Sequence, residues 1–184
     1  MIYFTADNHF CHMKIIKHCQ RPFHDERIMN NEMIHRWNSV VDKKDEIYIL
    51  GDFIYKGTAR EANEILSRLN GKKYLIKGNH EKYLDDKDFN HNVFEWVKDY
   101  YVLSAEDLKI VLFHFPILSW YNSHHNSIHL YGHVHNSGIL YPEFGEILKI
   151  LGPRAINVGV DVNDFYPVSL VEIKSRIFSK TGNN

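Results

Sequence analysis

The residues Glu46-Ile47-Tyr48-Ile49-Leu50-Gly51-Asp52 form a short apolar run that ends abruptly at a glycine and an acid. A run of this length, rich in β-branched and aromatic residues, is typical of a strand that is buried on both faces. Two other stretches have the same form. Residues 2–6 stop at Asp7, and residues 73–77 stop at Gly78-Asn79-His80. We therefore predict three buried strands, each followed at once by a polar loop.

Helical patterns separate these strands. Asp25 can cap a first helix, whose apolar face is formed by Met29, Met33, Trp37 and Val40 or Val41. The second helix begins with the capping-box pattern Thr58-Ala59-Arg60-Glu61 and ends before Gly71, a residue suited to a C-terminal cap. The order strand, helix, strand, helix, strand favours parallel pairing and an α/β sandwich.

The second half of the chain adds strands at residues 100–104, 109–113, 128–131 and 155–158. Residues 81–99 have a mixed pattern that predicts no definite element. Near the C-terminus, Ser169-Leu170-Val171-Glu172 is again a capping-box pattern and indicates a short helix, although an edge strand over 168–173 is an alternative.

Composition restricts the class of protein. The 184 residues fit one domain spanning 1–184, and the formal net charge of −1 lacks the basic footprint of a dedicated double-stranded nucleic-acid binder. This charge does not exclude binding of a small nucleotide or of a single nucleic-acid strand in a local groove. The chain has no signal core and no apolar run approaching the roughly 18 residues of a membrane span, so we expect a soluble, cytoplasmic protein that does not bind membranes. We interpret Cys11 and Cys19 as reduced thiols.

Histidine is unusually abundant, with 13 residues, and it gathers with acids at the ends of apolar runs. Because loops converge at the carboxyl ends of strands in α/β sheets, these polar clusters should face one crevice. Five runs end in such a cluster: Asp7-Asn8-His9, Gly51-Asp52, Gly78-Asn79-His80-Glu81, His114 and Gly132-His133-Val134-His135.

The side chains in these clusters are carboxylates and imidazoles, with one amide and no thiolate. Such a set suits manganese, iron, zinc or cobalt, and it offers more groups than one ion needs. Two ions bridged by one aspartate is the economical interpretation.

Each cluster also has a structural explanation when taken alone. Asp7 and Asp52 could cap the loops that follow them, Gly78-Asn79 could be a plain turn, and His114 could be a satisfied core histidine. The five clusters together favour a metal site.

The order Asp-x-His, Gly-Asp, Gly-Asn-His-Glu, His, Gly-His-x-His over residues 7–135 resembles the calcineurin-like metallophosphoesterase superfamily. The segment through Arg21-Pro22-Phe23 and the stretch Asn157-Val158-Gly159-Val160-Asp161 resemble a compact bacterial and phage branch of it. The resemblance implies a four-layer α/β/β/α sandwich of two mixed sheets flanked by helices.

The resemblance also implies a role for each motif residue. Asp7, His9 and His135 would hold one ion; Asn79, His114 and His133 would hold the other; Asp52 would bridge them. Two such cations activate a bridging hydroxide as the nucleophile in phosphoester hydrolysis. His80 would be the catalytic residue that donates a proton to the leaving oxygen. Manganese is the first expectation for the metal, and iron, zinc, cobalt or nickel are alternatives.

The expected activity is phosphodiester hydrolysis on a small molecule or nucleotide. Phosphomonoester hydrolysis and a non-catalytic metal-binding scaffold of the same fold are the alternatives. The sequence indicates no oligomeric state.

Several residues lie outside the shared pattern. Relatives often carry an acid or arginine shortly after the Gly-Asp motif, whereas Phe53-Ile54-Tyr55 follow here, which leaves the support of that loop in question. His12 and Arg21 are candidate substrate contacts, and His124, His125 and His129, between two motif strands, are candidates of the same kind. Asp161 is expected to be a structural acid.

Overall fold

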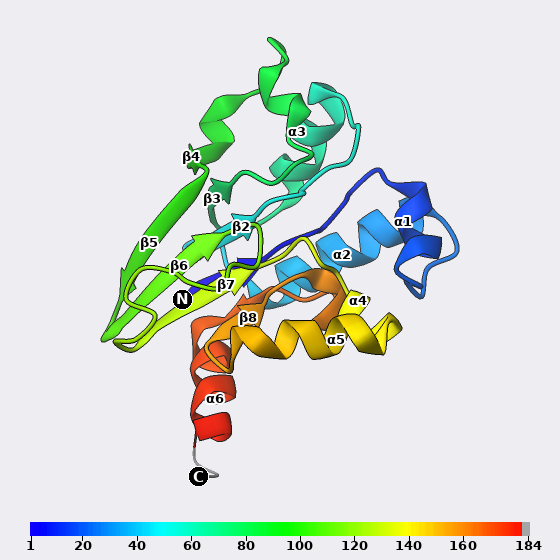
Figure 1. The fold of residues 1–184 in the computed structure, drawn as a ribbon. Coiled ribbons are helices and arrows are strands. Elements are labelled where there is room, and N and C mark those ends of the chain that lie inside the picture. The colour runs from blue at the N-terminus through cyan, green and yellow to red at the C-terminus, as the bar shows by residue number, and fades with distance from the viewer. Residues whose placement is uncertain (182–184) are drawn as a thin grey trace.

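The computed structural model describes residues 1–181, in which two mixed sheets lie face to face with helices flanking them (Figure 1). The first sheet has the strand order β4-β3-β2-β1-β9. Its strands are β1 Ile2–Thr5, β2 Glu46–Leu50, β3 Lys72–Ile76, β4 Phe94–Lys98 and β9 Val168–Ser169. Neighbours from β4 to β1 are parallel, and β9 pairs antiparallel with β1.

The second sheet has the order β5-β6-β7-β8. Its strands are β5 Tyr100–Ala105, β6 Leu108–Phe113, β7 Ser127–Tyr131 and β8 Ala155–Asn157. β5 and β6 form an antiparallel hairpin, while β6, β7 and β8 are parallel. The predicted α/β fold with two mixed sheets and flanking helices is therefore confirmed.

Six α-helices and four 3₁₀ segments are assigned in the described part of the chain. The α-helices are α1 Met13–His18, α2 Glu26–Val40, α3 Ala59–Arg68, α4 Ser137–Leu140, α5 Pro142–Leu148 and α6 Leu170–Thr181. The 3₁₀ segments are η1 Lys82–Asp85, η2 His91–Val93, η3 Lys149–Leu151 and η4 Val160–Val162. Asp25 caps α2 and Thr58 forms the expected capping box on α3, as their sequence patterns predict.

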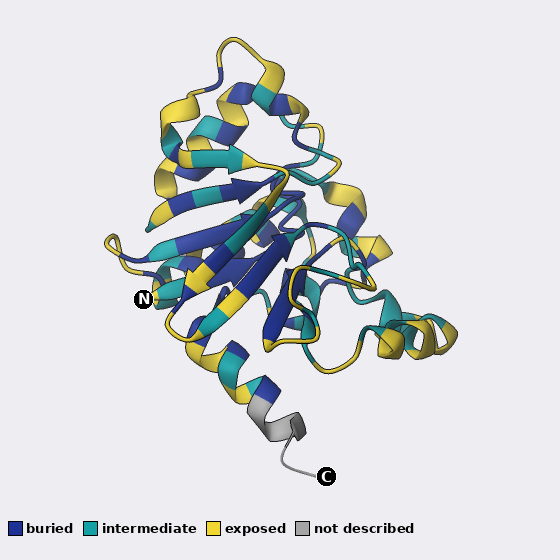
Figure 2. Ribbon diagram, turned by 60° about the vertical axis from the view of Figure 1, so that its left-hand side comes forward, coloured by how far each residue is buried: buried dark blue, intermediate teal, exposed yellow. Residues whose placement is uncertain are grey.

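Alternation along the strands of the first sheet creates two cores. Ile47 and Ile49 of β2 point towards α2 and α3, whereas Tyr48 and Leu50 point towards the second sheet. The strand centres are accordingly buried, whereas α4 and α5 are exposed or half-buried (Figure 2). Trp120, in the loop before β7, packs against His129 of that strand.

Differences from the sequence prediction lie in the segments with weak patterns. Residues 8–24 contain α1, residues 81–99 contain β4, and residues 137–151 contain α4, α5 and η3. Near the C-terminus, both alternatives, an edge strand and a helix, are present: the short strand β9 comes first and α6 follows it. Ser169 and Glu172 are hydrogen-bonded as in a capping box. Within residues 1–181, no helix combines the length and apolar character needed to cross a bilayer.

Candidate functional site

The predicted site residues come together at one edge of the two sheets. Asp7 follows β1, Asp52 follows β2 and Asn79 follows β3, while His114 follows β6 and His133 follows β7. Because β1–β3 are parallel to each other and β6–β8 are parallel to each other, their carboxyl ends deliver these side chains to a common crevice.

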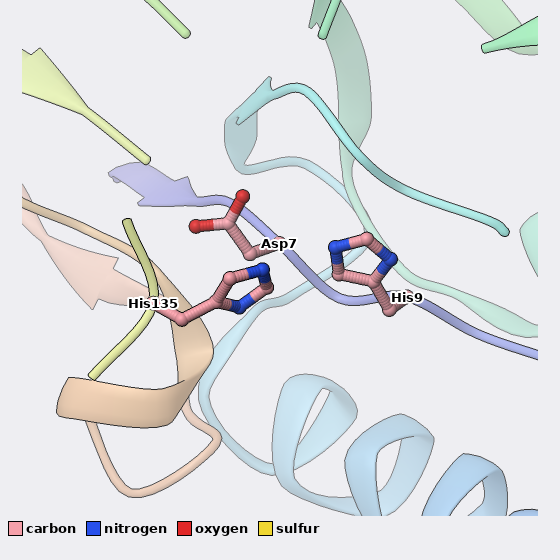
Figure 3. Close-up of side chains that lie close together, drawn as sticks. All are labelled: Asp7, His9 and His135. Carbon is pink, nitrogen blue, oxygen red and sulfur yellow. The ribbon is translucent and has the colours of Figure 1, made fainter. Parts of the chain in front are cut away.

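Asp7, His9 and His135 form a first group. Each offers one ligand atom, and these atoms lie within 4.8 Å of one another. Figure 3 shows the three side chains gathered beside the loop after β1. Asp7 and His9 are at most 2% exposed, so the group is enclosed by protein.

Several polar atoms of this first group have no hydrogen-bond partner within the described residues 1–181. They are Asp7 Oδ2 and both ring nitrogens of His9. Buried polar atoms are normally paired, since leaving one unsatisfied costs about 1–3 kcal/mol. A divalent cation would satisfy an orphaned carboxylate oxygen and an imidazole nitrogen together, so the residues fit a metal ion.

A hydrogen bond to Asp161 holds the His135 ring in one orientation. Its Nδ1 lies 2.8 Å from Asp161 Oδ2, and a carboxylate can only accept there, so Nδ1 carries the proton. The other ring nitrogen is then the atom that can bind a cation. Metal-ligating histidines commonly have this kind of carboxylate support.

Arg21 completes this support. Its guanidinium donates two hydrogen bonds to the Asp161 carboxylate, at 2.8 and 2.9 Å, and two more to the carbonyls of Asp7 and Asn8. The side chains of Arg21 and Asp161 are 0% and 1% exposed. Arg21 is thus enclosed by protein, and the substrate contact expected from the sequence does not agree with its position.

Asp52, His114 and His133 form a second group, with ligand atoms again within 4.8 Å of one another. Asn79 belongs to it, because its Oδ1 lies 3.2 Å from His114 Nε2 and 3.1 Å from His133 Nδ1. His114 Nδ1 donates to the carbonyl of Leu50 at 2.7 Å, which turns Nε2 towards the crevice.

Asp52 lies between the two groups. Its Oδ2 is 3.5 Å from His9 Nε2 on one side and 3.6 Å from His114 Nε2 on the other. Its Oδ1 accepts hydrogen bonds from the backbone N–H groups of Asn79 and His80. One carboxylate oxygen is therefore fixed by the backbone and the other faces both groups.

The backbone at these residues is unusual. Five of the seven candidate ligands have φ between 48° and 71°: Asp7, His9, Asp52, His133 and His135. Non-glycine residues rarely adopt this left-handed conformation, which costs about 1–3 kcal/mol for each residue. Eight other non-glycine residues of the described chain share this conformation, but at the site it falls on most of the candidate ligands, as is common at functional sites.

Gly132 allows the two sheets to approach each other at the site. A Cβ atom there would lie 2.6 Å from Ala6 Cβ and 2.8 Å from Asp7 Oδ2, closer than real side chains come. Any larger residue would displace Asp7. The glycine before His133 is thus required by the close approach of backbone and carboxylate.

Glu81 supports the loop after β2, a role that sequence reasoning did not assign. It accepts from the N–H of Phe53 at 3.0 Å and from the N–H of Gly78 at 2.7 Å, and so joins the loops after β2 and β3. Burial, with the nearby charge of Asp52, raises the pKa of Glu81 to about 7. The glutamate of the Gly-Asn-His-Glu motif thereby replaces the support expected after the Gly-Asp motif.

His80 is a partly accessible histidine beside Asp52. Its side chain is 32% exposed, and its Nε2 lies 3.8 Å from Asp52 Oδ2. Tyr55 packs its ring edge-on to His80, with ring centroids 4.7 Å apart, and stacks on His12 at 3.7 Å. His12 therefore lies beside the site, where its contact with a substrate stays a prediction, and Tyr55 is an addition that the sequence pattern did not reveal.

The remaining histidine candidates lie elsewhere. His129 is fully buried, stacks on Tyr131, packs against Trp120 at a tilt, and faces the carbonyls of Val111 and Phe115. A substrate contact for His129 is therefore wrong. His124 and His125 are in the loop that leads to the first residue of β7, at the opposite end of that strand from Gly132.

Burial changes the protonation of the first group. It raises the pKa of Asp7 to about 6 and, helped by neighbouring cations, holds that of His9 far below its usual value. Burial also acts to lower the pKa of His135, but hydrogen bonds with Asp161 and Cys19 and the charge of Asp7 outweigh it and raise the value to about 10. Neutral His9 is ready to bind a cation, while His135 must first lose a proton.

Comparisons with known proteins give relatives over most of the chain. No family model matches. The uncharacterized protein MJ1445 of Methanocaldococcus jannaschii is 36% identical over 171 residues, which covers 92% of this chain and 86% of that protein. The Gene 66 protein of Mycobacterium phage D29 is 27% identical, covering 92% of this chain and 93% of the phage protein.

Among solved structures, the protein of unknown function AQ665 from Aquifex aeolicus has a TM-score of 0.72 and 26% identity, over 95% of this chain and 98% of that one. The two proteins share one fold from end to end. The E. coli phosphoesterase YfcE matches more distantly, with a TM-score of 0.40 and 18% identity over 73% of this chain and 69% of its own.

The Arg21–Asp161 pair gives a prediction about stability. Arg21→Met keeps most of the side-chain volume but leaves the buried Asp161 carboxylate without its cation, so we expect a loss of about 3–5 kcal/mol in the free energy of unfolding. Urea unfolding followed by tryptophan fluorescence measures it. Arg27→Met, at an exposed position of α2, is the matched control and should change stability by less than about 0.5 kcal/mol. Equal small effects of the two substitutions would contradict a structural role for Arg21.

Proposed function

This chain belongs to the family of the uncharacterized protein MJ1445 of Methanocaldococcus jannaschii, and we propose that it is a metal-dependent phosphoesterase that acts on phosphodiesters. The position of Asp52 carries the proposal. One of its oxygens faces His9 of the first group and His114 of the second, at 3.5 and 3.6 Å. Two groups that share a carboxylate are the arrangement expected of a dinuclear metal site.

The donor set supports two divalent cations, with manganese as our first choice. Asp7, His9 and His135 would hold one ion, Asn79, His114 and His133 the other, and Asp52 both. Carboxylate and imidazole donors favour manganese, iron, zinc or cobalt over softer metals. Such a pair of ions supplies a water of lowered pKa and offsets the charge of a phosphate.

The chain's own residues would do the rest of the chemistry. His80 can reach a substrate, because it is partly exposed and does not belong to either group of candidate ligands. Its imidazole would donate a proton to the oxygen that leaves phosphorus. Tyr55 would hold the His80 ring at the edge of the site, and His12 would contact the substrate beside it.

The position of Arg21 favours a diester over a monoester. A phosphomonoester carries a second negative charge near neutral pH, and a free arginine would help to neutralise it. Arg21 is fully engaged with Asp161 and two backbone carbonyls, so it cannot supply that help. A singly charged diester suits the site better.

Two chromogenic esters test this proposal. With manganese added, we expect bis(nitrophenyl) phosphate to be hydrolysed faster than nitrophenyl phosphate, and we expect a chelator to abolish both activities. Preference for the monoester would make the protein a phosphomonoesterase. Metal-loaded protein that is inert on both esters would instead support a non-catalytic scaffold.

His80 gives a sharper test of the site. His80→Ala should lower kcat on the diester by about 10²- to 10⁴-fold, the usual contribution of a general acid. Elemental analysis should find the same amount of bound metal as in the unsubstituted protein, because His80 is outside both groups. His91→Ala, in η2, is the control for loss of a histidine elsewhere. Unchanged turnover in His80→Ala would exclude the proposed role.

Cation affinity should depend on pH. Asp7 and His135 have raised pKa values, about 6 and about 10, so a cation must displace their protons. Affinity should therefore increase as pH rises, and it should increase more steeply below about pH 6, where Asp7 also holds a proton. Calorimetric titration with Mn²⁺ across this range measures the trend. Asp7→Asn should bind more weakly and lose the steeper part, whereas an affinity independent of pH would contradict this arrangement.

A further inference from the structure

A groove of about 860 Å³ lies between α1 and α4, outside the two groups of candidate ligands. Four of the lining residues are lysines or histidines, which are positively charged or become so on protonation: Lys14, Lys17, His18 and His24. Another kind is apolar or aromatic and includes Leu140 and Tyr141 of the opposite wall. In the described chain, none of the residues that line the groove is acidic.

The basic residues of α1 share one face of the helix. Lys14, Lys17 and His18 have the spacing i, i+3 and i+4, which places their side chains next to one another. All three are exposed. Across the groove, Tyr141 is 52% exposed and presents an aromatic ring. The groove therefore combines a row of positive charge with an aromatic surface.

Both walls of the groove begin at the candidate metal site. The residue that precedes α1 is His12, whose ring centroid is 5.3 Å from that of His9. The residue that precedes α4 is Asn136, which directly follows His135. Asn136 Nδ2 donates to the carbonyl of Cys19 at the end of α1, at 2.8 Å, and so ties the two walls together (Figure 1). Both walls of the groove therefore start beside residues of the first group of candidate ligands.

We propose that this groove binds single-stranded nucleic acid and leads one of its phosphodiesters into the site. The proposal rests on the phosphodiesterase activity proposed above and names its substrate class. A single strand presents phosphates and bases in alternation, which matches the lysines and the tyrosine. A duplex binder would carry a broad basic surface, whereas the net charge of this chain is −1 and two lysines line this groove with no acid among its lining residues.

Binding of a fluorescent 12-nucleotide single strand, followed by anisotropy in the presence of a chelator, tests the groove without turnover. The double substitution Lys14→Glu/Lys17→Glu should weaken binding more than tenfold. Lys43→Glu/Lys44→Glu makes the same charge change at two exposed lysines before β2, at the end of the sheet opposite the site, and should alter affinity by less than twofold. Equal weakening by both pairs would overturn the proposal, because only net charge would then matter.

Stacking and salt dependence test the same groove independently. Tyr141→Ala should weaken binding about fivefold to a hundredfold, the usual effect of losing one stacked base. Tyr121→Ala, a tyrosine of equal exposure near the start of β7, is the matched control. Two phosphate contacts predict roughly sevenfold weaker binding between about 50 and 200 mM salt. Binding that is insensitive to both Tyr141→Ala and salt would overturn the groove as the nucleic-acid site.

Hydrolysis of bis(nitrophenyl) phosphate separates this proposal from the general one. Lys14→Glu/Lys17→Glu should leave that activity unchanged, because the small ester needs no groove. If the ester is hydrolysed but the strand does not bind, or if anionic phospholipid vesicles bind in its place, the groove proposal fails and the phosphodiesterase stands. If the strand binds as predicted but no ester is hydrolysed, the proposed activity fails and the groove stands as a nucleic-acid site.

Discussion

The rest of the structure depends on the burial of two carboxylates, Asp7 and Asp52, at the ends of neighbouring parallel strands. Both side chains are almost fully enclosed. An ionised carboxylate in such a place needs compensation from donors or cations. Backbone N–H groups of His133, Asn79 and His80 bond one oxygen of each. The other oxygen of Asp52 faces two imidazoles, and that of Asp7 has no hydrogen-bond partner among residues 1–181. The loops of both sheets are shaped by this requirement.

The requirement also explains the strained backbone at the candidate ligands. Asp7, His9 and Asp52 turn back at once after their strands, with φ between 50° and 56°. A relaxed loop would carry the side chains away from the crevice. The cores on both faces of the first sheet hold the strands rigidly enough to maintain this strain. The packing of the two cores thereby keeps the candidate metal ligands close together.

Much of the fold could be predicted because its signals are local. The runs that become β1, β2 and β3 end sharply at polar residues. The helix after Thr58 is predicted by its capping box and its apolar face. β4 was missed because Phe94–Lys98, at the edge of the sheet, has no regular alternation: one residue is buried, two are half-buried and two are exposed. The α4–α5 segment was missed because it buries little apolar surface and so has no clear period.

The candidate site divides in the same way. Residues at strand ends could be grouped from sequence because parallel strands bring their ends together. Arg21 was misassigned because an arginine in a basic segment looks the same whether it faces solvent or a buried acid. Its partner is 140 residues away, and nothing local in the sequence indicates that pairing. Glu81 was seen as part of a motif, but its bonds to two loops need three-dimensional contacts to be recognised.

The long separation of Arg21 and Asp161 has a consequence for biosynthesis. A chain emerging from the ribosome presents Asp7, His9 and Arg21 first, while β9, the neighbour of β1, and Asp161 come near the end. The early strands can pair, but the pocket around His135 cannot close until its last acid has been made. Contacts of such long range form slowly. During synthesis, Asp7 and His9 would therefore be made long before the acid that orients His135, and the incomplete pocket would be accessible to metal ions and to other chains.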